Sequence, residues 1–453
     1  MRSKHASRWA LIGIIALAIA LFVPGAYRNL LADKEEAYQS LKIFSDVLDI
    51  VARDYVDEVD NKKLIENAIQ GMVSSLDPHS ALLTPDAFKE LQIGTQGEFT
   101  GIGIHVTMRD NLVTVISPIE GTPAYRVGIR AGDRIIRVDD KPTDNLTDAV
   151  KLMRGPKGTE VTITILREGE PKQIDFKIVR DLIPIHSVKA TMIRPGYGYV
   201  WVTHFRENTG SDLVAALDQM EKSDPPMKGL VLDLRDNPGG VLEQAIRISD
   251  LFINDGIIMT SKGRLKRHTR VYPATKGGKA RTYPMVVLIN GGSASASEIV
   301  AGALQDSKRA LVIGTTSFGK GSVQAIENLR DGYALKLTIA RYYTPSGRSI
   351  QAKGVEPDII VPLQDVAEEA AEKSRLLKEK DLLNHLDDGQ GDKPKSDVKV
   401  PPESKQPELK ELPKQVQTRL NPLDSEQLMK DSQVRRAMDI LMGYDIFKKL
   451  GNG

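Results

Sequence analysis

Apolar residues recur at helical spacing in the N-terminal part of the chain. Leu41, Phe44, Val47 and Val51 follow one another at intervals of three or four residues, and the same spacing resumes at Ile65. The stretch SSLDPHS interrupts this pattern with a proline, and TPDAFKEL restarts it with a threonine at the N-cap and a proline at the first helical position. We therefore predict a helical region over residues 38–96, which either packs on its neighbour or serves as an oligomerisation element.

Shorter periods and turn residues mark the next segment, residues 97–182. LVTVISPI, DRIIRVDD and VTITILREG are β-branched runs separated by turns, and one helical stretch, TDAVKLMRG, lies before the third run. This order of short strands, one helix and glycine-rich turns predicts a compact β-rich domain.

Strands and helices alternate over residues 183–362. YVWVTHF, GLVLDL, MVVLIN and ALVIG have the pattern of strands, while GSDLVAALDQMEK, VLEQAIRISDLF and ASEIVAGALQD have helical spacing. The strands are continuously apolar, which is typical of a sheet covered on both faces. We therefore predict an α/β core.

The composition changes beyond residue 362. Residues 363–420 are charged and rich in proline and lysine, with almost no large apolar side chains in DDGQGDKPKSDVKVPPESKQPELKELPK. Such a segment buries too little surface to offset its ordering entropy, so we predict a partly disordered linker. Apolar periodicity returns in residues 421–453 at SQVRRAMDILMGYDIF, which predicts a C-terminal helical segment docked either on the body of the protein or on a partner.

Residues 1–26 carry the pattern of an export signal. Arg2, Lys4 and Arg8 precede an uncharged apolar run from Trp9 to Val23. The run is short for a bilayer span, and no clear cleavage site follows it. We expect either a cleaved signal peptide or a retained membrane anchor. Both interpretations place the exported protein in the cell envelope, in the periplasm or anchored to the inner membrane and facing the periplasm.

The composition excludes several classes of ligand and of catalytic group. The net charge of +2 gives no sign of a nucleic-acid-binding face, and 27% charged with 41% hydrophobic residues is ordinary for a globular protein. The chain has no cysteine, which excludes disulfides, thiol nucleophiles and cysteine-ligated metals. We expect neither a metal nor another cofactor.

Three serines at alternate positions offer a candidate nucleophile. Ser293, Ser295 and Ser297 stand in NGGSASASEIVAGALQD before an apolar helical run. They either cap that helix, as the capping-box pattern of Ser295 with Glu298 indicates, or one of them attacks a substrate. Among the seven histidines, His204 has the best position for a base, but a histidine at a strand end is more often structural. The chain also lacks a G-x-S-x-G elbow.

A lysine offers an alternative base. Lys320 lies between two glycines in GTTSFGKGSVQ, just past a buried-looking strand. It is either a surface lysine in a turn or a neutral general base whose pKa is lowered by burial, with the glycines allowing close backbone approach. Gln324, four residues on, is in reach to orient the amine by a hydrogen bond. In LVLDLRDNPGG a strand enters a turn before a helix, where amides form an ordinary tight turn or bind an oxyanion.

These motifs, together with YYTPSGRSIQAKGVEPD, resemble those of the C-terminal processing peptidases, or tail-specific proteases, a serine family that uses a Ser-Lys dyad. The resemblance covers roughly residues 41–361. It implies that Ser295 is the nucleophile, that Lys320, 25 positions later, is the base, and that Gln324 assists it. It also implies an oxyanion hole made by the amides of Ala296 and of a glycine in the N-P-G-G turn, with Gly240 preferred to Gly239.

The same resemblance implies that residues 97–182 form a PDZ domain. EFTGIGIHV would contain its carboxylate-binding loop, in which backbone amides take the terminal carboxylate of a peptide that adds as a strand. The loop residues are Phe99, Thr100, Gly101, Ile102, Gly103 and Ile104. Arg154, at the end of the PDZ helix, is expected to couple the PDZ domain to the catalytic site.

The resemblance further implies a peptidase core like the crotonase/ClpP fold, with an inserted PDZ domain and helical terminal segments. The expected function is an exported endopeptidase that recognises protein or peptide substrates with free C-termini. The expected partners also include further copies in a homo-oligomer and an activating adaptor protein. The alternative is a non-catalytic PDZ adaptor of the cell envelope. An acyl-CoA enzyme on the related fold is disfavoured by the PDZ-like segment and the export signal.

Overall fold

The computed structural model describes residues 38–143, 145–279, 281–362, 378–382, 384–386 and 423–451. The predicted export signal lies outside these residues, as does most of the predicted linker. Contacts divide the chain into two units, residues 1–75 and 76–453, which are described separately. In the first unit, residues 38–54 are helical and α2 spans Asn61–Ser74. Within the described ranges, no helix is both long and apolar enough to span a membrane.

The second unit begins with a short strand and a helix. β1 spans Ala81–Leu83 and α3 spans Pro85–Gln96. Thr84 is the N-cap of α3 and its side chain accepts the amide of Ala87 at 3.4 Å, while Pro85 stands at the first helical position, where its missing amide costs nothing. The start of this helix is therefore where the sequence predicted it.

The β-rich segment folds as an antiparallel sheet packed with two helices, a single-turn one and a longer one. Its strands run in the order β3-β4-β5-β7-β8, so β3 lies at an edge, and β6 pairs with β5. β2 pairs with β9 and brings the two ends of the segment together, as expected of an inserted domain. The elements are β2 (Glu98–Gly101), β3 (Ile104–Arg109), β4 (Leu112–Pro118), α4 (Pro123–Arg126), β5 (Arg134–Val138), β6 (Lys141–Pro142), α5 (Leu146–Met153), β7 (Glu160–Leu166), β8 (Ile174–Val179) and β9 (Asp181–Pro184).

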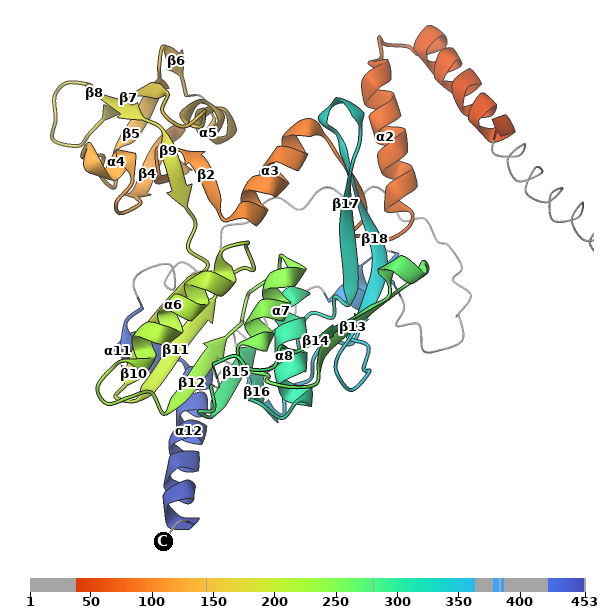
Figure 1. Ribbon diagram of the computed structural model, residues 1–453. Coiled ribbons are helices and arrows are strands. Elements are labelled where there is room, and N and C mark those ends of the chain that lie inside the picture. Colours follow the sequence, from red (N-terminus) through yellow and green to blue (C-terminus); the bar gives the residue numbers. More distant parts are fainter. Residues whose placement is uncertain are drawn as a thin grey trace, which may run out of the picture. The chain divides into compact units, whose positions relative to one another are not determined.

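The core contains a six-stranded sheet in the order β10-β11-β12-β15-β16-β19. All neighbours are parallel except the hairpin of β10 with β11. Figure 1 shows α6, α7 and α8 side by side on one face of this sheet. The elements are β10 (Val188–Arg194), β11 (Tyr197–Val202), α6 (Thr209–Glu221), β12 (Gly229–Asp233), α7 (Leu242–Asp250), β15 (Met285–Ile289), α8 (Ala296–Asp306), β16 (Leu311–Gly314) and β19 (Ile359–Ile360).

Both faces of this sheet are buried, which confirms the expectation drawn from its continuously apolar strands. On β12, Leu230 and Leu232 belong to the cluster that includes α6, α7 and α8, whereas Val231 belongs to the cluster on the opposite face. That second face is covered by α11 (Ser425–Leu428) and α12 (Ser432–Gly451). The C-terminal helical segment therefore docks on the body of its own chain, the first of the two alternatives that the sequence left open.

A second, antiparallel sheet lies beside the first. Its order is β1-β18-β13-β14, and β17 pairs with β18 as a long hairpin. β1 contributes residues from the N-terminal region, because Ala81 is opposite Lys336 in the ladder with β18. The elements are β13 (Ile257–Gly263), β14 (Arg270–Pro273), β17 (Ser322–Asn328) and β18 (Ala334–Tyr343).

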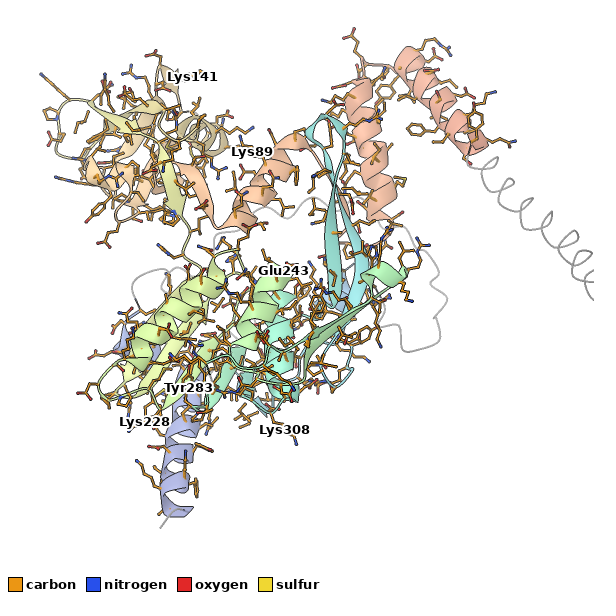
Figure 2. The ribbon with its side chains drawn as sticks, in the orientation of Figure 1. Lys89, Lys141, Lys228, Glu243, Tyr283 and Lys308 are labelled. Carbon is orange, nitrogen blue, oxygen red and sulfur yellow. The ribbon has the colours of Figure 1, made fainter. Side chains whose placement is uncertain are left out.

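The two ends of the parallel strands are easily told apart in Figure 2. Lys228, Tyr283 and Lys308 precede β12, β15 and β16 and mark the amino ends, whereas Glu243, in the first turn of α7, lies at the carboxyl ends. In open α/β sheets, ligands bind outside the carboxyl ends of the strands. All three motifs singled out in the sequence follow those ends.

Candidate active site

Three loops meet because they leave three neighbouring strands of the core sheet. Asp-Asn-Pro-Gly-Gly follows β12, the serine-rich turn follows β15, and the lysine loop follows β16. Backbone contacts join them: the amide of Ala294 donates to Asn237 at 2.9 Å, and the amide of Phe318 donates to Ser293 at 3.0 Å. Motifs that are far apart in the sequence therefore form one site.

The structure distinguishes the three serines. Ser293 and Ser297 are fully buried, and their hydroxyls donate to the carbonyls of Leu234 at 2.7 Å and Asn237 at 2.8 Å. Ser295 is only partly buried. Ser293 and Ser297 thus stabilise the backbone of the turn. Ser295 is the one serine of the three that is accessible to a substrate.

Ser295 stands in a strained backbone conformation at the start of α8. It is the N-cap of the helix, with φ 54° and ψ −111°, a region that non-glycine residues avoid at a cost of about 1–3 kcal/mol. With Glu298 it forms a capping box, in which the Ser295 amide donates to the Glu298 carboxylate at 2.8 Å. The glutamate half of the predicted capping box is formed, whereas no helix amide among the described residues donates a hydrogen bond to the Ser295 hydroxyl. A strained strand-to-helix turn is also how nucleophilic serines are presented in other folds.

The lysine loop is packed closely against the backbone of a neighbouring segment. A side chain at Gly321 would place its Cβ 2.6 Å from the amide nitrogen of Gln351, and Gly319 has φ 104°. Both glycines are therefore required by close approach or by positive φ. Burial, with the nearby charge of Lys336, lowers the pKa of Lys320, while Glu379 and two other carboxylates oppose this. A lowered pKa is what a lysine general base needs.

One buried carboxylate joins the serine turn to the lysine loop. Glu298 is fully buried, and its Oε2 accepts the amides of Ser295 at 2.8 Å and Lys320 at 2.9 Å. Its Oε1 accepts the amide of Gly319 at 2.7 Å and the hydroxyl of Ser317 at 2.5 Å. Burial raises the pKa of Glu298 to about 7, against the effect of these four donors.

A tyrosine joins the same two residues from the carbonyl side. The hydroxyl of Tyr342, on β18, donates to the carbonyl of Ser295 at 3.0 Å and also to the carbonyl of Lys320. A hydroxyl has one proton, so the two carbonyls share it. The backbone positions of Ser295 and Lys320 are therefore fixed by two independent side chains.

Gln324 lies in a different hydrogen-bond network from the one that the sequence predicted. Its amide nitrogen donates to Ser322 at 2.9 Å and to Thr338 at 3.3 Å, and the Thr338 hydroxyl donates to Asp77 at 3.1 Å. Within the described residues, no hydrogen bond joins Gln324 to Lys320. Its role in orienting the amine therefore remains a prediction.

The two glycines of the N-P-G-G turn differ in what their amides do. The amide of Gly239 donates to the side chain of Asn237 at 2.9 Å, and Gly239 is buried. Gly240 is exposed, and its amide has no hydrogen-bond acceptor among the residues that the structure describes. Gly239 lies against the serine turn, because a Cβ there would be 3.0 Å from the amide nitrogen of Ala296. The amide of Gly240 is thus available to an oxyanion, while closeness to Ala296 is seen for Gly239, so the preference for Gly240 stays a prediction.

Of the predicted carboxylate-binding loop, residues 99–101 belong to β2 and Ile104 begins β3, so that only Ile102 and Gly103 connect the two strands. Gly103 has φ 81°, and a Cβ there would overlap Thr122 at 2.3 Å, so the loop requires glycine. Ile102 and Gly103 accept hydrogen bonds through their carbonyls, but their amides have no acceptor among the described residues. The edge strand β3 follows directly, and apolar residues of β3 and α5 pack on the domain core. On its outer side, β3 pairs with no other described strand.

Arg154 is the C-cap of α5 and faces α3 rather than the catalytic loops. Its guanidinium binds Glu90 of α3 and lies over the ring of Phe99, 5.6 Å from the centroid. α3 follows β1, which pairs with β18, the strand that carries Thr338. A continuous set of elements thus leads from Arg154 to the network of Gln324.

The turn Asp77–Ser80 contributes to this network although no motif in the sequence predicts it. Asp77 is buried and accepts the amide of Ser80 at 2.9 Å as well as the Thr338 hydroxyl, and Nε2 of His79 lies 2.7 Å from Glu379. In the sequence, SSLDPHS predicts only a break in the helical pattern. The acid and the histidine that directly precede a short apolar strand are the feature that could have indicated a functional turn. His204, in contrast, makes no hydrogen bond to Ser295 within the described residues.

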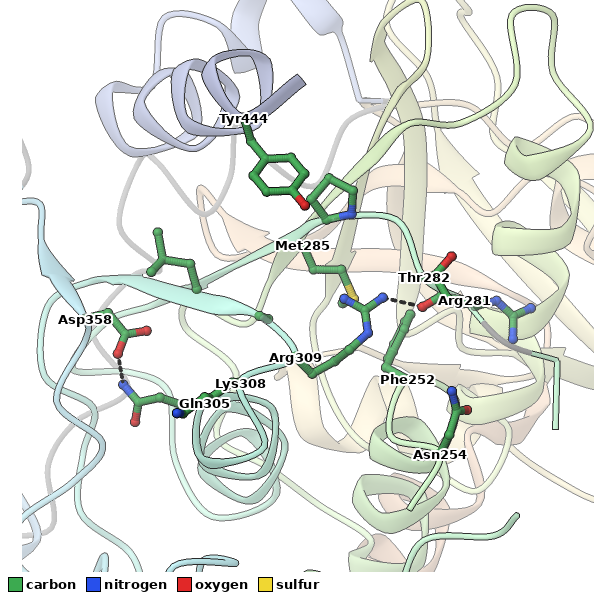
Figure 3. A pocket seen from close by; sticks show the side chains of 13 residues that line it. Phe252, Asn254, Arg281, Thr282, Met285, Gln305, Lys308, Arg309, Asp358 and Tyr444 are labelled. Atoms are coloured by element: carbon green, nitrogen blue, oxygen red, sulfur yellow. Dashed lines mark hydrogen bonds between the residues drawn. The ribbon is translucent and has the colours of Figure 1, made fainter. Parts of the chain in front are cut away.

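A pocket at the opposite, amino end of the strands takes no part in this site. Figure 3 shows Arg309 at its centre, with Arg281 and Tyr444 at its border. Arg309 donates to the carbonyls of Arg281 and Tyr283, at 2.9 Å for the latter, so its guanidinium supports the loop before β15. Of the three motifs, only the far end of the serine motif reaches this pocket, through Gln305 near the C-terminus of α8.

Family models match most of the described chain. The model described as peptidase family S41 matches residues 196–361, the PDZ domain model matches residues 100–178, and the model for the N-terminal domain of the activating protease CtpB matches residues 26–86. The PDZ match confirms the domain type expected for residues 97–182.

Similar proteins carry concordant descriptions. A carboxy-terminal-processing protease from Bartonella bacilliformis is 48% identical over 358 residues, which cover 78% of this chain and 82% of that protein. The carboxy-terminal processing protease CtpA of Bacillus subtilis is 38% identical over 359 residues, 78% of this chain and 76% of that protein. Among solved structures, the photosystem II D1 C-terminal processing protease shares 31% identity, covers 70% of this chain and 92% of that chain, and has a TM-score of 0.41.

Proposed function

This chain belongs to the S41 family of carboxy-terminal processing serine proteases, and we propose that it hydrolyses peptide bonds with Ser295 as nucleophile and Lys320 as general base. The observation that supports this assignment is the pair of bonds from the amides of Ser295 and Lys320 to one carboxylate oxygen of Glu298. Through these bonds one carboxylate fixes the backbone of both residues. Ser295 is the one serine of the three that is not fully buried, and Lys320 has a lowered pKa.

The proposed reaction proceeds through an acyl-enzyme. Neutral Lys320 takes the hydroxyl proton of Ser295 as its oxygen attacks the scissile carbonyl carbon. The amides of Ala296 and Gly240 bind the oxyanion, and the Lys320 ammonium then gives its proton to the leaving amine. A water molecule attacks the resulting ester and loses its proton to Lys320. Collapse of the second intermediate returns that proton to Ser295 and releases a new carboxyl terminus.

We further propose that substrates are captured by their free C-termini in the PDZ domain. The amides of Ile102 and Gly103 would bind the terminal carboxylate, within the loop Phe99–Ile104, and the peptide would pair with the edge strand β3. Arg154, through Glu90 and α3, would then couple PDZ occupancy to the network of Gln324. We propose that Gln324 reorients towards Lys320 in the working state.

The remaining proposals concern architecture and location. The mixed sheet with helices on both faces supports a crotonase/ClpP-like peptidase core. The N-terminal pattern supports export to the cell envelope as a cleaved or anchored protein. Regulation by an activating adaptor and assembly into a homo-oligomer are proposed from the family resemblance, to which the match of residues 26–86 to the CtpB N-terminal domain adds the N-terminal region.

A direct test uses the full chain and a protein substrate with an apolar C-terminus. Ser295→Ala and Lys320→Ala should each abolish cleavage while leaving thermal unfolding unchanged. Lys89→Ala, on the exposed side of α3, serves as the matched lysine control and should cleave normally. Full activity of Lys320→Ala would overturn the dyad, and absence of cleavage by the unmodified chain, with substrate bound, would favour the adaptor.

A further inference from the structure

A short segment of the predicted linker lies on the lysine loop. Lys378 donates through its amine to the carbonyls of Thr316 at 2.7 Å and Ser317 at 2.8 Å. The next residue, Glu379, begins a single turn of 3-10 helix, η3 (Glu379–Asp381), and its amide donates to the carbonyl of Phe318 at 3.3 Å. The composition of residues 363–420 predicted a partly disordered linker, yet this part contacts the loop that presents Lys320.

Glu379 inserts a fully buried carboxylate beside that loop. Its Oε1 accepts the side-chain amide of Gln351 at 2.8 Å and also lies 2.8 Å from Nε2 of His79. The side-chain oxygen of Gln351 in turn accepts the amide of Gly321 at 2.8 Å. One chain of hydrogen bonds therefore runs from Glu379 through Gln351 to the residue that follows Lys320.

Glu379 also acts on Lys320 through its charge. The groups that perturb the pKa of Lys320 are Lys336, which lowers it together with burial, and Glu379, Glu298 and Asp77, which raise it. Glu379 has the largest effect among the three carboxylates. It comes from a segment separated from the core in sequence, whereas Glu298 belongs to the serine motif itself.

We propose that Glu379 is a positioning residue for Lys320, which holds the lysine loop through Gln351 and places a buried negative charge beside that loop. This inference rests on the proposed function of Lys320. A general base works best when its protonation midpoint is near the working pH. Burial and the charge of Lys336 lower the pKa of Lys320, and the charge of Glu379 limits this decrease.

Two substitutions of Glu379 distinguish the effect of its hydrogen bonds from the effect of its negative charge. In Glu379→Gln, the amide oxygen can still accept from Gln351, and the amide nitrogen can donate to Nε2 of His79 when that nitrogen is unprotonated, so the contacts are retained. In Glu379→Ala, both the contacts and the charge are lost. The exposed Glu243 on α7 supplies the control Glu243→Gln, which removes one carboxylate at the same end of the sheet (Figure 2).

The measurement is kcat against pH for the full chain, with a peptide that has a free apolar C-terminus. For Glu379→Gln we expect a plateau within about threefold of the wild type and an acidic limb displaced to lower pH, because a charge that favours the ammonium is gone. For Glu379→Ala we expect the same displacement and a plateau about tenfold lower, because Gln351 loses its acceptor. Glu243→Gln should follow the wild-type curve.

The outcomes are distinguishable from failure of the dyad. If Lys320→Ala remains active, the proposed function is wrong. If Lys320→Ala is inactive and the acidic limb of Glu379→Gln stays at the wild-type pH, the charge role of Glu379 is refuted. A wild-type plateau in Glu379→Ala would refute its positioning role. If Glu379→Ala unfolds, the limb of Glu379→Gln still decides the question.

Discussion

The backbone amides of Ser295 and Lys320 donate to the same oxygen of the Glu298 carboxylate, at 2.8 and 2.9 Å. Their carbonyls share the hydroxyl of Tyr342. The nucleophile turn and the lysine loop leave different strands, so contacts between the two loops must set their separation. These two fully buried side chains do so together with the backbone bond from Phe318 to Ser293.

Glu298→Gln should therefore reduce kcat with little change in KM. The substitution preserves size, but an amide nitrogen would face either the amides of Ser295 and Lys320 or the donors Gly319 and Ser317. A buried donor without an acceptor costs about 1–3 kcal/mol, and a loss of that size in the transition state would lower kcat by about 5- to 160-fold. Steady-state kinetics on a cleavable peptide measure this effect.

The matched control for this change is Glu327→Gln, an exposed glutamate on β17. It should have wild-type kcat and KM. A Glu298→Gln variant with wild-type kcat would mean that the shared oxygen is not needed to place the dyad.

Lys336→Gln should displace the acidic limb of kcat to higher pH. The positive charge of Lys336 lowers the pKa of Lys320, so its removal raises that pKa, and Lys320 then becomes neutral only at higher pH. The direction is opposite to that expected for Glu379→Gln. A kcat profile measured across the acidic limb tests the sign, and a displacement to lower pH would contradict the electrostatic account.

Periodicity predicted those parts of the fold that are set by neighbours in the sequence. The start of α8 at Ala296, the Thr84 cap and the two-faced sheet all follow from local patterns. Long-range contacts carry no such pattern. Glu298 was expected only to cap its helix, and its bonds to Lys320 and Ser317 depend on β15 and β16 being neighbours in the sheet.

Residues whose partners lie in another segment were missed for the same reason. Glu379 lies in a stretch whose composition gives no core signal, and its contact with His79 joins residues 300 positions apart. Family resemblance selected Ser295 among the three serines. The burial of Ser293 and Ser297 now gives a separate physical reason for that choice.

Amidation of a peptide C-terminus should weaken its binding at least tenfold. The proposed carboxylate loop offers backbone amides at Ile102 and Gly103, and hydrogen bonds to an ionised acceptor are about twice as strong as neutral ones. Fluorescence anisotropy of a labelled peptide with the inactive Ser295→Ala chain measures this without cleavage. Equal affinity for the acid and the amide would exclude recognition of the terminal carboxylate by this loop.

Gly103→Val should abolish the preference for the free acid. The residue has φ 81°, and a Cβ there would overlap Thr122, so the loop must deform. Gly169→Val is a suitable control, because Gly169 has φ 84° but open space around its Cβ position. If the Gly169→Val chain lost the preference equally, the effect would be one of general strain in the domain.

Asp431→Ala should destabilise the protein and detach its C-terminal helix. Arg235 is fully buried, and its guanidinium binds Asp233 on β12 and Asp431 before α12, the latter at 2.9 Å. Arg235 keeps Asp233 in the variant, so the loss is that of the hydrogen bonds to Asp431, which costs about 1–3 kcal/mol for a buried charged donor. The apolar face of α12 at Val434, Ala437, Met438 and Leu441 covers the sheet, so its release would expose a large apolar surface.

Denaturant unfolding of the Asp431→Ala chain should show a lower midpoint, while Asp439→Ala, on the exposed side of α12, should leave the midpoint unchanged. Arg235 also precedes the N-P-G-G turn, so cleavage activity should fall together with stability. An Asp431→Ala chain with the wild-type unfolding midpoint would show that apolar packing alone holds α12 in place.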